Sequence, residues 1–241
     1  MPVTQPGARP PRATRGWTVL VPVKALDRAK TRLRPAMGGR TAALALAFAL
    51  DTLDAAGRAC RVEGIHVVTD DPLAAAEAVG LGAGVLPDLG GGDLNLAVVL
   101  AADLLTASDV GLGVAVLPAD LPGLAPADLD VALAEAASHR RAFLADADGT
   151  GTTLLTARAG HPLRPRYGPR SALAHREQGA HPLRVPAPTV RADIDRSDDL
   201  PGLLGRSCGR RTRELLDRHL RGSPRPSDAL PQTSHVGPPS A

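Results

Sequence analysis

The stretch TVLVPVKALDRAKTRL (residues 18–33) joins an apolar run to the only two lysines of the chain. Its first part, TVLVPV (18–23), is short, continuous and rich in valine, which is typical of a strand buried on both faces. The second part carries Lys24 and Lys30. The other lysine or arginine positions of the chain, which has 28 in all, are arginines. Lysine is a compact ammonium on a flexible stem and suits a phosphate better than a planar guanidinium fork does. Two such charges just beyond a first strand predict a phosphate site at the edge of an α/β sheet, with a solvated basic loop as the alternative.

Apolar runs and helical patterns alternate along the rest of the chain. We predict strands at 17–23, 65–70, 82–88 and 113–122, two more within 143–157, and a late one in the segment 190–200 followed by a capped helix. Helices are predicted at 40–60, from Pro72, at 90–107, near 126–138 and within 166–180. This alternation predicts an α/β fold with a doubly wound, mostly parallel sheet. We expect one domain over 16–221, between disordered tails at 1–15 and 222–241.

Composition excludes several classes of protein. With four aromatic residues and a formal charge of +3, the chain offers neither stacking platforms nor a basic track for nucleic acid. The longest apolar stretch, TAALALAFAL (41–50), ends at Asp51 and is too short to cross a bilayer, and the N-terminus has no apolar signal core. Cys60 and Cys208 form no CxxC pair and fit reduced thiols. We therefore expect a cytoplasmic protein without a membrane or nucleic-acid partner, as a monomer or homodimer.

Acidic residues gather where strands are predicted to end. Asp120 follows VAVLPA, and Asp193 and Asp195 are two residues apart, hence on one face if the segment is extended. Asp146 and Asp148 form a similar pair beside a glycine loop. Carboxylates of this kind, with substrate phosphates, are the ligands that Mg²⁺ prefers. Surface aspartates at strand–loop junctions are the alternative, and no histidine pair at ligand spacing is visible among His66, His139, His161 and His181.

Two further segments combine glycine with small polar side chains. GTGTT, which includes Thr153, is rich in small hydroxyl and backbone donors. YGPRS places Gly168 and Ser171 just before a predicted helix, where backbone N–H groups favour an anion; turn chemistry with an ordinary N-cap serine is the alternative. In GGGDLNLA (90–97), Gly92 could let a flat base approach the backbone, and Asn95 offers it a donor and an acceptor. A flexible connection is the alternative there.

Seven segments follow one another from residue 17 to about 203: VPVKALDRAKTRL, VVTDD, GGDLN, LPADLP, DADGTGTTLL, YGPRSALAH and DIDRSDDL. Together, and in this order, they resemble one family, the guanylyltransferases of coenzyme F-420 biosynthesis (CofC in archaea, FbiD in actinobacteria). The resemblance implies a nucleotidyltransferase fold of the GT-A type. It also implies transfer of GMP from GTP to phosphoenolpyruvate, giving enolpyruvyl-diphospho-5′-guanosine and pyrophosphate. Related members use 2-phospho-L-lactate or 3-phospho-D-glycerate, and the chain's motifs leave this choice open.

The resemblance also implies a role for individual residues. Thr153, Gly168 and Ser171 correspond to the phosphoenolpyruvate-binding positions of the family, and Asp120 and Asp193 to its Mg²⁺ ligands. We expect Lys24, Lys30 and Arg32 to act in catalysis by neutralising the triphosphate and the departing pyrophosphate. Lys24, Lys30, Gly92 and Asn95 are the predicted nucleotide-binding residues, although Asp93 departs from the pattern expected in that turn. The alternatives are a nucleotidyltransferase with another nucleotide or a sugar phosphate, and a nucleotide-binding protein without catalysis.

Overall fold

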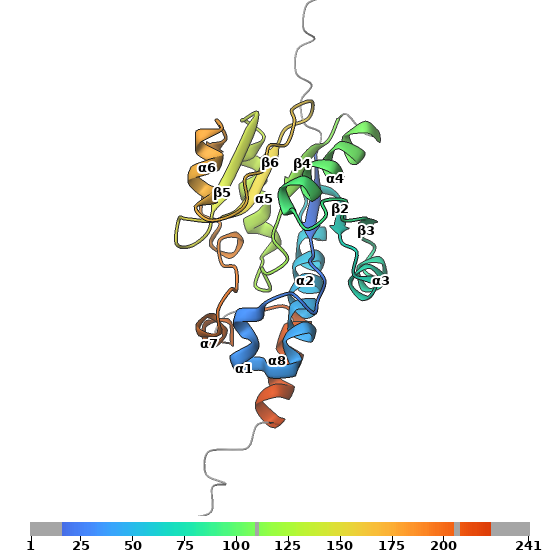
Figure 1. The fold of residues 1–241 in the computed structure, drawn as a ribbon. Coiled ribbons are helices and arrows are strands. Elements are labelled where there is room, and N and C mark those ends of the chain that lie inside the picture. The colour runs from blue at the N-terminus through green and yellow to red at the C-terminus, as the bar shows by residue number, and fades with distance from the viewer. Residues whose placement is uncertain (1–15, 109–110, 205–207, 223–241) are drawn as a thin grey trace, which may run out of the picture.

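The computed structural model describes residues 16–108, 111–204 and 208–222, and a seven-stranded sheet forms its centre (Figure 1). The strand order is β3-β2-β1-β4-β6-β5-β7. Neighbouring strands are parallel from β3 through β2 and β1 to β4, and again between β5 and β7, whereas β6 runs antiparallel to both β4 and β5. The strands are β1 (Trp17–Pro22), β2 (Val62–Val68), β3 (Gly84–Leu86), β4 (Gly113–Val116), β5 (Arg141–Ala145), β6 (Thr152–Ala157) and β7 (His181–Pro182).

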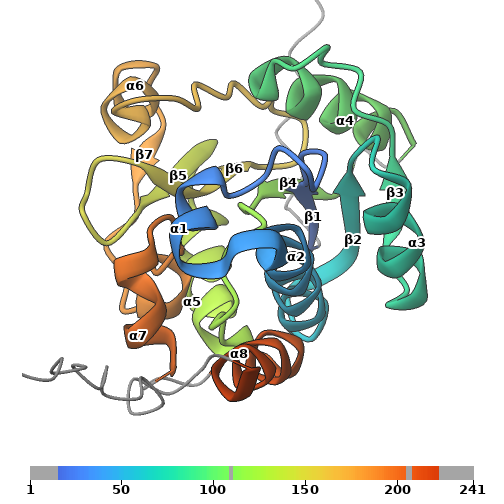
Figure 2. The ribbon, with the colours of Figure 1, turned by 60° about the horizontal axis from the view of Figure 1, so that its bottom comes forward.

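Helices cover both faces of the sheet (Figure 2). The helices are α1 (Arg34–Met37), α2 (Thr41–Gly57), α3 (Pro72–Gly80), α4 (Leu94–Ser108), α5 (Pro126–Ala136), α6 (Ser171–Glu177), α7 (Leu200–Leu204) and α8 (Arg210–Gly222). Successive residues of β1 enter different cores: Val19 and Val21 pack with α2 and α5, whereas Leu20 packs with α4. Such a strand needs apolar residues at every position, which is why its sequence is a continuous apolar run. The prediction of a doubly wound, mostly parallel sheet is confirmed.

The prediction of a late strand in segment 190–200 is wrong. Pro188–Val190 forms a 3-10 turn, Arg191–Arg196 has no regular structure, and a second 3-10 turn at Ser197–Asp199 leads into α7. The segment pairs with another loop instead, because Ile194 N donates to Asp120 O at 3.1 Å. The short parallel edge strand β7, just before it, was not predicted.

Helix α8 was also missed, and it is joined to α2 through Asp51. This aspartate lies within the apolar helix α2, and its side chain is only 2% exposed. Its carboxylate accepts from Arg211 N at 3.2 Å and Thr212 N at 2.8 Å, the free N–H groups of the first turn of α8. The buried charge thus has partners in another helix. No helix in the described ranges is long and apolar enough to cross a membrane. The predicted tails, at 1–15 and beyond Gly222, lie outside the described residues.

Candidate functional site

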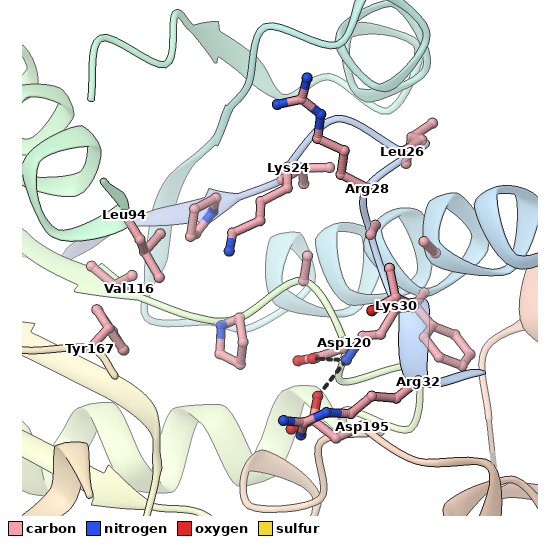
Figure 3. Close-up of a pocket in the computed structure, with 18 of the residues that line it drawn as sticks. Lys24, Leu26, Arg28, Lys30, Arg32, Leu94, Val116, Asp120, Tyr167 and Asp195 are labelled. Carbon is pink, nitrogen blue, oxygen red and sulfur yellow. Dashed lines mark hydrogen bonds and ion pairs between the residues drawn. The ribbon is translucent and has the colours of Figure 1, made fainter. Parts of the chain in front are cut away.

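A pocket of about 360 Å³ opens beyond the C-terminal ends of β1 and β4 (Figure 3). In a parallel sheet, ligands bind at this edge, where loops of neighbouring strands diverge. Lys24, Lys30 and Arg32 line the pocket from the loop after β1, as the sequence predicted for one shared site. Asp120 lines it from the loop after β4. On the opposite side in Figure 3 lie Leu94, at the start of α4, and Tyr167.

The loop that carries the lysines is fixed by Asp71. The Asp71 carboxylate accepts from Leu26 N at 2.9 Å, and also from Leu73 N and Ala74 N at the start of α3. The hydrogen bond from Leu26, with those from α3, lowers the pKa of Asp71. Lys24 is exposed within this loop and makes no ion pair with any described residue. Its ammonium is therefore available to an anion in the pocket.

Lys30, in contrast, is held by the acidic residues. Its Nζ forms an ion pair with Asp120 and donates to Asp195 Oδ1 at 2.8 Å and to Ile194 O at 2.6 Å. Burial disfavours the ammonium form, but the charges of Asp120 and Asp195 outweigh it, so the pKa of Lys30 is raised. Its backbone lies in the left-handed region with φ +51°, which is uncommon for a residue with a side chain. A sparsely populated conformation held by three contacts indicates a functional constraint.

Three carboxylates meet at this point. Asp120, Asp193 and Asp195 each present an oxygen, and the three oxygens lie within 4.8 Å of one another. Burial and the neighbouring charges of Asp120 and Asp195 raise the pKa of Asp193 to about 7. Asp120 Oδ1 is buried and accepts from none of the described residues. Asp120 Oδ1 is thus a buried oxygen without a donor, and the neighbouring Asp193 has no ion pair with a described residue; this arrangement fits a divalent cation.

The structure thus brings Asp120 and Asp193, the two predicted metal ligands, close together. Both lie in loops, whereas the sequence predicted that each would stand at the end of a strand. Asp195 was noted in the sequence as the neighbour of Asp193, and the structure places it in the same cluster. Asp146 has a different role: its carboxylate accepts from Thr150 N at 2.9 Å and Gly151 N at 2.7 Å, and closes the glycine turn between β5 and β6.

The predicted acceptor residues lie behind the pocket wall opposite the acids. Thr153, Gly168 and Ser171 do not line the pocket themselves, but Thr152 and Tyr167 do. Ser171 Oγ donates to Thr152 Oγ1 at 3.2 Å, and Thr153 Oγ1 is buried without a partner among the described residues. Gly168 has φ +143°, and no heavy atom lies within 4 Å of where a Cβ would stand. Only glycine adopts this conformation readily, and it leaves the backbone open to a ligand.

Asn95, predicted to bind the base, has both of its amide atoms on the backbone of Tyr167. Oδ1 accepts from Tyr167 N at 2.7 Å, and Nδ2 donates to Tyr167 O at 3.1 Å. Gly92 is exposed in the turn before α4 with φ +96° and open space around it. Base binding by Gly92 and Asn95 stays a prediction.

One histidine pair was not visible in the sequence. His139, three residues after the end of α5, and His181 in β7 stack with ring centroids 3.7 Å apart and planes 9° apart, and Glu135 Oε1 lies 3.6 Å from His139 Nε2. A metal ion lies in the plane of each imidazole that binds it, and two parallel planes at this separation cannot share one ion. The cluster in this geometry is a stacked pair rather than a metal site.

Comparison with known proteins identifies the family of the chain. The family described as guanylyl transferase CofC-like matches residues 17–233. The chain belongs to this family. Both the resemblance and the class of enzyme inferred from the sequence, a nucleotidyltransferase, are thereby confirmed.

The similarity to curated relatives and to a solved structure covers most of this guanylyl transferase chain. Phosphoenolpyruvate guanylyltransferase of Streptomyces scabiei is 50% identical over 85% of this chain and 97% of its own length. The protein of that name in Thermomonospora curvata is 46% identical over 86% of this chain and 92% of its own. A structure from Desulfovibrio desulfuricans described as a nucleotide-diphospho-sugar transferase superposes with a TM-score of 0.63 at 20% identity, over 85% of this chain and 95% of its own. This likeness shows that the two chains share a fold.

Sequence reasoning missed the residues that hold the site in place. Asp71 was recognised only as part of the VVTDD segment, and its bond to Leu26 N joins residues 45 positions apart. His175, within YGPRSALAH, is buried and links β6 to the loop before α6. The one local signal was Pro72, which marks the first turn of α3 and so identifies Asp71 as its N-cap.

Proposed function

We propose that this protein transfers GMP from GTP to phosphoenolpyruvate, giving enolpyruvyl-diphospho-5′-guanosine and pyrophosphate, as a cytoplasmic step in coenzyme F-420 biosynthesis. The observation that carries the proposal is the convergence of lysines and carboxylates in one pocket at the strand ends, in a chain whose relatives bear this enzyme name. The geometry supports a reaction between two anions, for which neutralisation of charge is the main requirement.

In the proposed reaction, a phosphate oxygen of the acceptor attacks the α-phosphorus of GTP, a new P–O bond forms and the bond to pyrophosphate breaks. The attacking oxygen is already ionised, so no protein base is required. Lys24 and Arg32 would neutralise the triphosphate, and Lys30 would join them when it leaves its acidic partners. Thr153, Gly168 and Ser171 would hold the acceptor in line with the α-phosphorus.

Asp120, Asp193 and Asp195 would hold Mg²⁺ in this proposal. The fit rests on Asp120 Oδ1, a buried acceptor without a donor in the described part of the chain, and on the raised pKa of Asp193. The ion would supply positive charge to the α-phosphate and to the leaving pyrophosphate. The carboxylates would fix the position of that charge beside the pocket.

The test is pyrophosphate release by the purified protein with GTP and Mg²⁺, comparing phosphoenolpyruvate, 2-phospho-L-lactate and 3-phospho-D-glycerate. We expect release with phosphoenolpyruvate, and with GTP in preference to CTP. Release with another of the acids would keep the reaction and change the acceptor. GTP binding without release, given all three acids, would contradict the proposal and support a nucleotide-binding protein without catalysis.

A further inference from the structure

The loop that leads from β6 to α6 is held by side chains of other elements. Residues 162–167 have no regular secondary structure, yet they reach the pocket wall at Tyr167. Backbone groups in such a loop need partners elsewhere or exposure to water. The backbone N–H groups of two consecutive residues, Arg166 and Tyr167, donate to the side chains of His175 and Asn95 respectively.

The side-chain amide of Asn95 forms two hydrogen bonds with the backbone of Tyr167, as a paired residue does in a β-sheet. Its Oδ1 accepts a hydrogen bond from Tyr167 N at 2.7 Å, and its Nδ2 donates one to Tyr167 O at 3.1 Å. Asn95 is itself fixed, because its backbone N donates to Asp93 Oδ1 at 2.8 Å in the turn that opens α4. The amide therefore ties the start of α4 to a residue 72 positions later in the chain.

His175 holds the preceding residue. Its Nε2 accepts from Arg166 N at 2.8 Å, so the proton lies on Nδ1, which donates to Thr152 Oγ1 at 2.9 Å. Burial, and then the charge of Arg141, lowers the pKa of His175 to about 4, so the ring stays neutral at physiological pH. Thr152 also accepts from Ser171. The loop and the predicted acceptor residues thus share one hydrogen-bond network.

We propose that Asn95 is a positioning residue for the acceptor phospho-acid, because its amide fixes the Tyr167–Gly168 backbone at the site where that acid binds. This inference rests on the proposed function and replaces the base contact expected for Asn95. Each of the two amide atoms that would read a base already bonds to Tyr167, so the amide is oriented toward the loop. Gly168 follows directly, with its backbone facing open space, and its position depends on that of Tyr167.

The chain offers a specific probe, since Tyr167 is its only tyrosine. Labelling with ¹⁵N-tyrosine gives one amide signal, and its hydrogen-exchange rate reports the bond to Asn95 Oδ1. Asn95→Ala removes both bonds, whereas Asn95→Asp keeps the acceptor for Tyr167 N and loses the donor to Tyr167 O. Leu96→Ala and Leu96→Asp are matched controls, because Leu96 is the next residue of α4 and is 47% exposed.

In Asn95→Ala we expect Tyr167 exchange to quicken about tenfold and KM for the acceptor to rise about tenfold, from two hydrogen bonds of ordinary strength. KM for GTP should stay within about twofold of wild type, a range that a lost contact to the nucleotide would exceed. Asn95→Asp should raise KM for the acceptor while Tyr167 exchange stays slow. The Leu96 variants should match wild type in both measurements.

Unchanged exchange in Asn95→Ala would overturn the pairing. Quickened exchange with a raised KM for GTP and an unchanged KM for the acceptor would overturn the positioning role in favour of base binding. A wild-type protein that releases no pyrophosphate with any of the three acids would refute the proposed function instead. The exchange rates of the folded variants would then still decide whether Asn95 holds the loop.

Discussion

The ammonium of Lys30 forms an ion pair with Asp120, a residue 90 positions away in the chain. The same ammonium bonds to Ile194 O and Asp195 Oδ1, so one cation joins the loops after β1 and β4 to the loop before α7. A divalent ion held by these carboxylates would share Asp120 and Asp195 with Lys30 and would repel its ammonium. We expect metal binding at these carboxylates to weaken the hold on Lys30, and the next predictions depend on this relationship.

Asp120→Asn should lower pyrophosphate release about a thousandfold at saturating GTP and acceptor, because an amide binds Mg²⁺ poorly and transition-state charge is left uncompensated. Turnover measured across a Mg²⁺ titration checks this. Asp103→Asn, an exposed aspartate on α4, is the matched control and should behave as wild type. Turnover of Asp120→Asn within a few-fold of wild type would show that Asp120 is not a metal ligand.

Lys30→Met should lower the free energy of unfolding by about 3 kcal/mol at pH 8 without divalent ions, since breaking a nearly buried ion pair leaves uncompensated carboxylates. The side chains of Lys30 and Asp120 are 14% and 16% exposed. Mg²⁺ should stabilise this variant more than wild type, because its competitor for the carboxylates is gone. Chemical denaturation with and without Mg²⁺ measures both effects.

Lys24→Met is the matched control, because Lys24 lines the same pocket without an ion pair to a described residue. Its unfolding free energy should stay within about 0.5 kcal/mol of wild type. Equal destabilisation of the two variants would mean that the pair with Asp120 contributes nothing specific.

The predictable parts of the fold are those with a local cause. β1 could be read from TVLVPV because a strand buried on both faces is apolar throughout, and α3 from Asp71–Pro72 because cap and first turn are adjacent. The prediction of a strand around Asp193 failed because the partners of this segment lie in distant loops: Ile194 N donates to Asp120 O. Asn95 shows the same limit, since an amide suits a base and a backbone equally well. Only the fold places Tyr167 beside it.

Asp193 should make stability depend on pH. Its pKa is about 7 in the folded protein, above the value of about 3.9 for an unperturbed aspartate. A raised folded pKa stabilises the protein fully below about pH 4, and this contribution is lost as the pH rises through 7. Asp193→Asn, which mimics the neutral acid, should therefore become more stable relative to wild type between pH 5 and about pH 8.

Unfolding free energies of the two proteins without divalent ions, measured at several pH values, give this difference directly. A constant difference from pH 5 to about pH 8 would show that Asp193 titrates in its usual range. With Mg²⁺ present, wild type should regain stability above pH 7, because the ionised carboxylate is the form that binds a metal.

Ser171→Ala should raise KM for the acceptor about three- to tenfold with little change in kcat, the effect of one lost hydrogen bond. The Ser171 hydroxyl is buried and bonds to Thr152, so its loss also disturbs the network that His175 organises. Steady-state kinetics with each substrate varied in turn distinguishes the sites. Ser138→Ala, exposed after α5, is the control. A change in KM for GTP alone would place Ser171 at the nucleotide.

Asp51→Ala should lower the free energy of unfolding by about 3 kcal/mol and leave kcat of the folded enzyme unchanged. The buried carboxylate accepts from two N–H groups of α8, and its removal leaves both unsatisfied, at about 1 to 3 kcal/mol each. No residue of α8 lines the pocket, so the chemistry should not respond. Asp54→Ala on the same helix, whose exposed side chain pairs with Arg58 alone among the described residues, should cost less than about 1 kcal/mol. Equal costs for the two variants would mean that Asp51 does not anchor α8.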